Sequence, residues 1–139
     1  MEKAILETIA NDYAEKEYKV QIICPEFTCL CPGKRDQPDF AIITIIYIPD
    51  NFLLELKSLK YYLTGFRDEE IYHESATNKI LQDLVDVLDP RYIRVIGDWN
   101  VRGGIKTIVE IDHSSKGWGG DPEKIDFIER KNTACQPNL

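Results

Sequence analysis

The sequence predicts an α+β domain with the element order ββααββ. Two observations carry this prediction. Segments rich in β-branched apolar residues lie at both ends of residues 18–111, and the segments between them repeat apolar residues every three or four positions. Proline or glycine lies at most junctions between these segments, where turns and helix ends are expected.

The first two segments predict strands. Residues 18–24 read YKVQIIC and residues 40–48 read FAIITIIYI, both with the β-branched and aromatic content that strands favour. The stretch between them holds three prolines and a glycine, so we expect a loop there. Pro49 ends the second strand.

The next two segments predict amphipathic helices over residues 53–66 and about 75–88. Their apolar positions are Leu56, Leu59, Leu63 and Phe66 in the first and Ile80, Leu81, Leu84, Val85 and Leu88 in the second. Asp89 and Pro90 end the second helix.

Two final strands are predicted over residues 93–101 and 105–111, joined as a hairpin by the turn 102–104. A sheet of four antiparallel strands leaves both outer strands unpaired, and proteins cover or share such edges. We therefore expect an oligomer. Residues 114–139 carry only a short helical pattern, over 123–130.

Length and charge limit the function classes. The 139 residues fit one domain, 1–139, and no apolar run is long enough to span a membrane. The N-terminus does not resemble a signal peptide, so we expect a cytoplasmic protein with reduced cysteines. A net charge of −7 disfavours nonspecific binding of nucleic acid, and an anionic ligand therefore needs a local basic patch.

Three cysteines, Cys24, Cys29 and Cys31, lie close together in the sequence. They lack the paired spacing of a structural zinc site, and we expect no metal. Cys24 fits a buried apolar position at a strand end, whereas Cys31 lies among proline, glycine and basic residues that can expose and activate a thiol. Cys31 is thus a candidate nucleophile, and the turn can bring the carboxyl group of Asp39 beside it.

Basic residues predict an anion site. Lys57, Lys60 and Arg67 share one helix face, and Arg102 lies in the last turn. Periodicity alone leaves two interpretations open, a solvated face or a phosphate site. The roles of His73 and Glu74 are also left open. A histidine can belong to the core, and a glutamate at a helix start is favoured by the helix dipole.

Taken together, these motifs resemble the NADPH-dependent 7-cyano-7-deazaguanine reductases, which make the aminomethyl precursor of the tRNA nucleoside queuosine. The blocks that carry the resemblance are EFTCLCP (26–32), QPDFA (37–41), YIPD (47–50), ELKSLKYY (55–62), FR (66–67), HE (73–74), DPRY (89–92) and RGG (102–104). The resemblance implies the tunnelling fold, in which ββααββ subunits pool their strands into an oligomeric barrel with active sites at subunit interfaces.

The resemblance also implies roles for individual residues. It assigns the nucleophile to Cys31, the general acid to Asp39, substrate contacts to Leu54, Glu55, Leu56, His73 and Glu74, and NADPH binding to Lys57, Lys60 and Arg102. One departure is that Cys31 and Asp39 are eight positions apart, one more than in the family pattern, so we expect a bulge and Asp36 becomes a rival acid. Ala76 stands where some relatives have a second cysteine that can protect the nucleophile.

The implied reaction reduces the nitrile of 7-cyano-7-deazaguanine with two NADPH through a covalent thioimide on the cysteine. The chain has no GxGxxG motif after a strand, so a Rossmann cofactor site is not expected. Three alternatives remain open: an amidine-forming enzyme of archaeosine synthesis, a zinc-dependent pterin or GTP enzyme of the same fold, and a noncatalytic oligomeric protein that binds the base.

Overall fold

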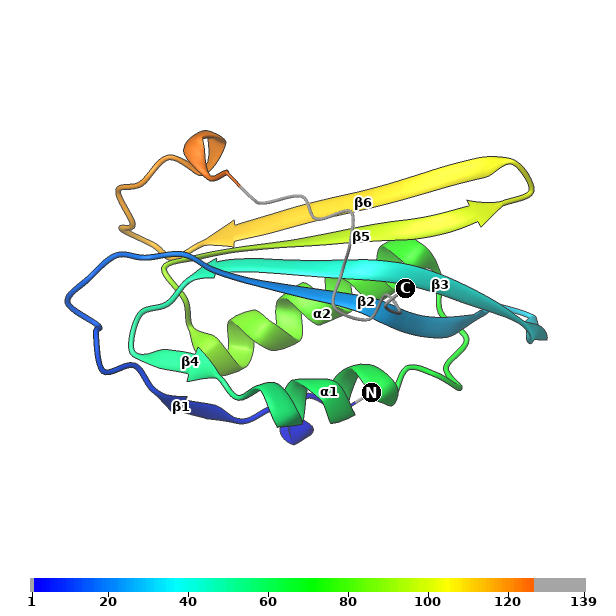
Figure 1. Ribbon diagram of the computed structural model, residues 1–139, viewed down its shortest axis with the longest axis horizontal. Helices are drawn as coiled ribbons and strands as arrows, with labels where there is room; N and C mark the ends of the chain where they lie inside the picture. The colour runs from blue at the N-terminus through cyan, green and yellow to red at the C-terminus, as the bar shows by residue number, and fades with distance from the viewer. Residues whose placement is uncertain (1, 127–139) are drawn as a thin grey trace, which may run out of the picture.

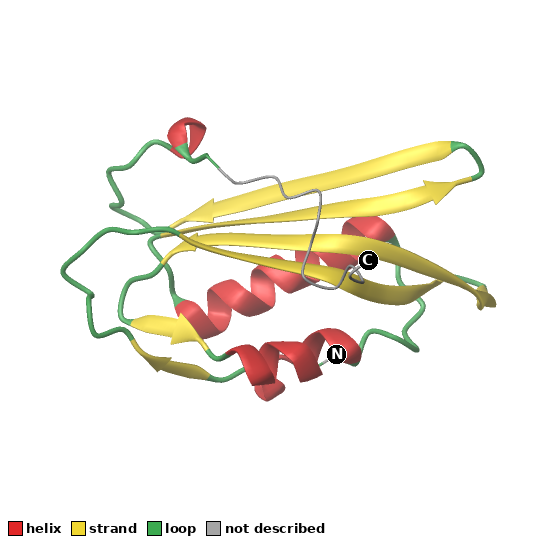
Figure 2. Cartoon of the chain, in the orientation of Figure 1, coloured by secondary structure: helices red, strands yellow, loops and turns green. Residues whose placement is uncertain are grey.

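The computed structural model describes residues 2–126 and confirms the α+β order ββααββ (Figure 1). One antiparallel sheet holds the strands β2 (Val20–Cys31), β3 (Lys34–Ile48), β5 (Tyr92–Arg102) and β6 (Ile105–Ser114), in that spatial order. The helices α1 (Leu56–Thr64) and α2 (His73–Leu88) cover one face of this sheet (Figure 2). The outer strands of the sheet are therefore β2 and β6.

The expected loop over residues 25–38 is wrong. The strands β2 and β3 continue through most of it as one long hairpin that turns at Pro32 and Gly33, where Gly33 has a φ of 80°. The prolines are tolerated because Pro25 lies at a register shift of an outer strand, and Pro38 lies where β3 pairs with β2 alone. Cys31 is consequently the last residue of β2, and Asp39 lies inside β3.

The predicted bulge lies next to this turn. Leu30 pairs with Pro38 while Cys31 pairs with Lys34, so residues 35–37 of β3 have no partner in β2. On the other side of this irregularity, Asp39 is in register with Cys29.

Two short segments were not predicted. The strands β1 (Thr8–Ala10) and β4 (Phe52–Leu54) pair with each other beside the N-terminus of α1, and η1 (Lys3–Ile5) precedes them. Because residues 52–54 are a strand, α1 begins three residues later than its apolar pattern predicts. Three-residue strands are too short to produce a periodic signal.

The core lies between the sheet and the helices. Ile80, Leu84 and Leu88 of α2 are fully buried, as predicted, against strand residues such as Ile43 and Val95. Val101 is an exception, because it is 59% exposed near the tip of the β5–β6 hairpin, which extends beyond the helices (Figure 1).

The described C-terminal part ends in η2 (Pro122–Lys124) instead of the start of a longer helix. The rest of the predicted helix, from residue 127, lies outside the described residues, as does Cys135. Between residues 2 and 126, no helix combines the length and the apolar character required to cross a membrane.

Candidate functional site

Five predicted site residues line one cavity of about 380 Å³. They come from three distant parts of the chain: Cys31 and Asp39 from the β2–β3 hairpin, His73 and Glu74 from the start of α2, and Arg102 from the end of β5. The cavity also involves residues that sequence reasoning did not assign to the site, namely Pro32, Gln37, Tyr72 and Gly103. The fold thus assembles a thiol, two carboxyl groups, an imidazole and a guanidinium.

Asp39 is the best-connected group of this cavity. Its residue is only 5% exposed, and its Oδ2 lies 3.2 Å from Nε2 of His73. Nη1 of Arg102 donates a hydrogen bond to Oδ1 of Asp39 and another, at 3.0 Å, to the carbonyl oxygen of Pro38. A carboxyl group held from both sides has a fixed orientation. Asp36 does not line this cavity, which favours Asp39 over its rival.

His73 is held by an aromatic ring and by the backbone of its own helix. Its imidazole stacks on the indole of Trp99 with a centroid distance of 4.2 Å and an interplanar angle of 8°. The hydroxyl of Thr77 donates to the carbonyl oxygen of His73. A Cβ at Gly97 would lie 2.7 Å from Oγ1 of Thr77 and 2.8 Å from Nε1 of Trp99, so glycine is needed there.

Cys31 differs from the other described cysteines. Its side chain is partly exposed, as is that of Cys24, but Cys31 alone among the described cysteines lines the cavity, and its Sγ has a long contact of 3.9 Å to the carbonyl oxygen of Pro32. Burial raises the pKa of Cys29 to about 12, and it does the same for Cys24. Both thiols are therefore protonated and weakly nucleophilic near neutral pH, whereas Cys31 faces the cavity.

Glu74 is exposed, and within the described part of the chain its carboxylate has no hydrogen-bond or ion-pair partner. It is the second residue of α2, where the helix dipole favours negative charge. This carboxylate is thus free to accept hydrogen bonds from a ligand in the cavity.

The remaining predicted site residues lie elsewhere in the subunit, around the start of α1. Leu54 is buried, and the carboxylate of Glu55 caps α1 by accepting hydrogen bonds of 2.8 Å from the backbone N–H groups of Lys57 and Ser58. These bonds, from Lys57 first, hold the pKa of Glu55 below its ordinary value. Both carboxylate oxygens of Glu55 are therefore used to cap α1.

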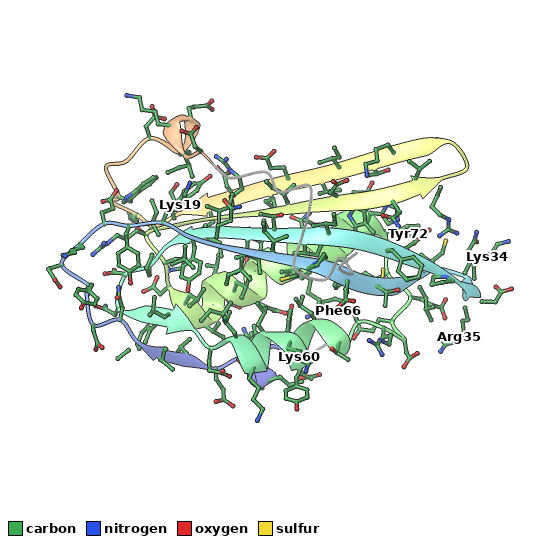
Figure 3. All side chains as sticks on the ribbon, viewed as in Figure 1. Lys19, Lys34, Arg35, Lys60, Phe66 and Tyr72 are labelled. Carbon is green, nitrogen blue, oxygen red and sulfur yellow. The ribbon has the colours of Figure 1, made fainter. Side chains whose placement is uncertain are left out.

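A second cavity of about 370 Å³ lies between α1 and β2 and is lined by Leu56 and Lys60. Within the described residues, neither Arg67, which also lines this cavity, nor Lys57 or Lys60 forms an ion pair, although the Glu55 carboxylate interacts electrostatically with Lys57. This cavity shares no lining residue with the Cys31 cavity. Figure 3 shows Lys60 well apart from Tyr72, which marks the other site.

Comparison with known proteins identifies the family. A family model described as "QueF-like protein" matches residues 38–118. NADPH-dependent 7-cyano-7-deazaguanine reductase from Magnetococcus marinus is 50% identical over 112 residues, which are 81% of this chain and 87% of the relative. Its counterpart from Nitrosomonas eutropha is 48% identical over 92% of this chain and 93% of its own length. The chain belongs to this reductase family.

A solved structure supports the fold of the reductase subunit. The apo archaeosine synthase QueF-Like has a TM-score of 0.57, with 23% sequence identity over 76% of this chain and 96% of its own. At that identity the likeness concerns the fold alone. Between residues 2 and 126, no group of three or more His, Cys, Asp or Glu side chains is arranged to hold a metal ion.

The donor chemistry around α1 fits the phosphates of a nicotinamide cofactor. Lys57 and Lys60 are cations one helical turn apart, and neither forms an ion pair within the described residues, although the whole chain has a net charge of −7. Arg102, the third predicted cofactor residue, instead contacts Asp39 in this subunit.

Proposed function

We propose that this chain reduces the nitrile of 7-cyano-7-deazaguanine to the aminomethyl group with two NADPH, as the names of its relatives indicate. The observation that carries the proposal is the cavity in which Cys31 and the Asp39–His73 pair meet. These groups supply what nitrile addition needs, because the nitrile carbon is electrophilic and its nitrogen is a weak base.

In the first step, the thiolate of Cys31 forms a bond to the nitrile carbon, and one π pair of the C≡N bond moves to nitrogen. The nitrogen takes a proton from Asp39, and the product is a covalent thioimide. His73 lies close enough to Asp39 to replace this proton. NADPH, if held by Lys57, Lys60 and Arg102, would supply the two hydrides. The first would reduce the thioimide carbon so that the Cys31 thiolate leaves and an imine remains, and the second, with one more proton at nitrogen, would give the amine.

Glu74 is proposed to recognise the base. An ionised carboxylate accepts two parallel hydrogen bonds from the N1–H and 2-amino groups of a guanine-like edge. Its position at the cavity and its lack of a partner in the described residues support this role. Leu54, Glu55 and Leu56 do not line this cavity in one chain, so their predicted substrate contacts are proposed only for a cavity completed by a second copy of the chain.

Cofactor binding is assigned to Lys57, Lys60 and Arg102, although the two lysines lie apart from the Cys31 cavity. We infer that a second copy of the chain brings its α1 to this cavity in a homo-oligomer. The unpaired outer edges of β2 and β6 support such an assembly, because an open edge is a pairing surface.

The test is the intact mass of the protein after incubation with the free nitrile base and again after NADPH is added. We expect an increase equal to the mass of the base, loss of that increase with NADPH, and no adduct for Cys31→Ala. An adduct that persists while NADPH is not oxidised would contradict the reductase and favour amidine-forming chemistry. A Cys31→Ala variant that still forms the adduct would contradict the assignment of the nucleophile.

A further inference from the structure

The turn that carries Cys31 is tied down by a carboxylate from another segment. Oε1 of Glu70 accepts a hydrogen bond of 2.8 Å from the backbone N–H of Gly33, and Oε2 accepts one of 2.9 Å from Nη1 of Arg35. Gly33 is two residues from Cys31, and Arg35 belongs to the unpaired residues 35–37 of the bulge. One side chain therefore restrains both the turn and the bulge.

The backbone around Glu70 is joined to the same strand end. The N–H of Leu30 donates to the carbonyl oxygen of Glu69 at 2.9 Å, and the N–H of Ile71 donates to that of Leu30 at 3.1 Å. Leu30 and Glu70 thus form a parallel bridge beside the end of β2. The short segment 69–71 is fixed against the strand that ends in Cys31.

This segment leads directly into the substrate-binding end of α2. Tyr72 is the N-cap of α2, and His73 and Glu74 are its first two residues. The backbone bridge and the Glu70 side chain therefore set where Cys31 lies relative to Glu74. In the proposed reaction this spacing decides whether the nitrile carbon meets the thiolate when the base is bound.

We propose that Glu70 is a positioning residue that holds the Cys31 turn in the geometry for attack on the bound nitrile; this inference rests on the proposed function. The turn needs such an anchor because residues 35–37, which follow it, have no pairing partner in β2. Residues without ladder hydrogen bonds keep more backbone freedom, and misplacement of a nucleophile by about 1 Å can cost on the order of 100-fold in rate.

The charge state of Glu70 agrees with this role. The hydrogen bond from Gly33, followed by that from Arg35, holds the pKa of Glu70 below its ordinary value. The carboxylate is thus ionised at neutral pH and accepts both bonds at once. Arg35 is 66% exposed at its side chain, so water competes for its bond, and the bond from Gly33 is expected to matter more.

The experiment compares Glu70→Ala, Glu70→Gln and Arg35→Gln with wild type in the full-length protein. Asp68→Ala is the matched control, since Asp68 is an exposed carboxylate of the same region without a hydrogen bond or ion pair in the described residues. Three quantities are measured: the rate of adduct formation with the free nitrile base, affinity for that base in a Cys31→Ala background, and alkylation of Cys31 by iodoacetamide.

We expect Glu70→Ala to slow adduct formation roughly 10- to 100-fold. The affinity of this variant for the base should stay within about twofold of wild type. Alkylation of its Cys31 should be as fast as in wild type or faster, because a small reagent needs no fixed turn.

The other variants rank the two bonds of Glu70. Glu70→Gln keeps an acceptor for Gly33 and should recover most of the rate of adduct formation. Arg35→Gln should lose less of this rate than Glu70→Ala, and Asp68→Ala should form the adduct at the wild-type rate.

Two results would overturn the inference: adduct formation by Glu70→Ala at the wild-type rate, or equal losses of adduct rate, affinity and alkylation, which indicate general damage. If Glu70→Ala does not fold, the rate of adduct formation by Arg35→Gln decides, and an Arg35→Gln rate equal to that of wild type also overturns the inference. Failure of the proposed function is distinguishable in the wild type, which would then form no adduct or would keep its adduct without oxidising NADPH.

Discussion

Replacement of Glu74 by glutamine tests base recognition with little interference from folding. Glu74 is exposed and has no side-chain partner in the described residues, so its loss removes only a favourable charge in the first turn of α2. That charge is worth less than about 1 kcal/mol. A hydrogen bond to a charged group contributes about 1.5–3 kcal/mol, and an amide both removes the charge and turns an N–H₂ donor toward a donor on the base.

The expected loss of affinity for 7-cyano-7-deazaguanine is therefore about 2–4 kcal/mol, or roughly 30- to 1000-fold in Kd. Calorimetric titration of the free base into Glu74→Gln in a Cys31→Ala background measures this affinity without covalent chemistry. Asp68→Asn provides the matched loss of an exposed carboxylate. The reasoning is refuted if Glu74→Gln binds the base within threefold of its parent, since the carboxylate would then not contact the base.

Three further changes test the site and its scaffold. Arg102→Ala should lower the free energy of unfolding by about 1–2 kcal/mol and slow adduct formation without NADPH about tenfold, because the buried Asp39 loses a partner. An unchanged rate of adduct formation would show that Arg102 does not support Asp39 in this step and would leave cofactor binding as its proposed role. Iodoacetamide at about pH 8, followed by peptide mapping, should modify Cys31 long before Cys29, because a pKa of about 12 leaves only ~10⁻⁴ of Cys29 as thiolate; equal rates would contradict this. Glu55→Ala should lower Tm by a few degrees at pH 7. The difference in Tm between wild type and Glu55→Ala should be complete above pH 4.5, the ordinary pKa of a glutamate, and should be lost as the pH falls through the lowered pKa of Glu55. A difference in Tm that persists in acid would contradict capping by the Glu55 carboxylate.

The sequence predicted the helices and strands that have a regular apolar pattern. The apolar repeat of α2 and the β-branched residues of β3 identify their own secondary structure, because burial of one face imposes a period. The distal part of the β2–β3 hairpin, residues 25–38, was expected to be a loop because Pro25 and Pro38 normally indicate turns. Whether a proline interrupts a strand depends on which neighbouring strand needs its N–H, and only the assembled sheet settles that question.

The candidate site shows the same limit. Motifs indicated Cys31, Asp39 and Glu74 one by one, but no local pattern indicates that the indole of Trp99 lies under His73. That contact joins β5 to α2 and depends on the space left by Gly97. Glu70 was missed for a related reason, since an exposed acidic residue before a helix is ordinarily a solvated charge.

The cationic area of Lys57 and Lys60 and the Cys31 cavity lie apart in one chain, and this separation bears on the expected oligomer. A net charge of −7 repels an anionic cofactor over most of the surface, so binding depends on a small cationic area such as that of Lys57 and Lys60. Neither lysine lines the Cys31 cavity in one chain. In the proposed reaction a hydride must nevertheless reach the carbon bonded to Cys31, and hydride transfer requires direct contact. If Lys57 and Lys60 hold the cofactor phosphates, as we propose, the α1 helix of a second copy of the chain at the Cys31 cavity would bring cofactor and substrate together.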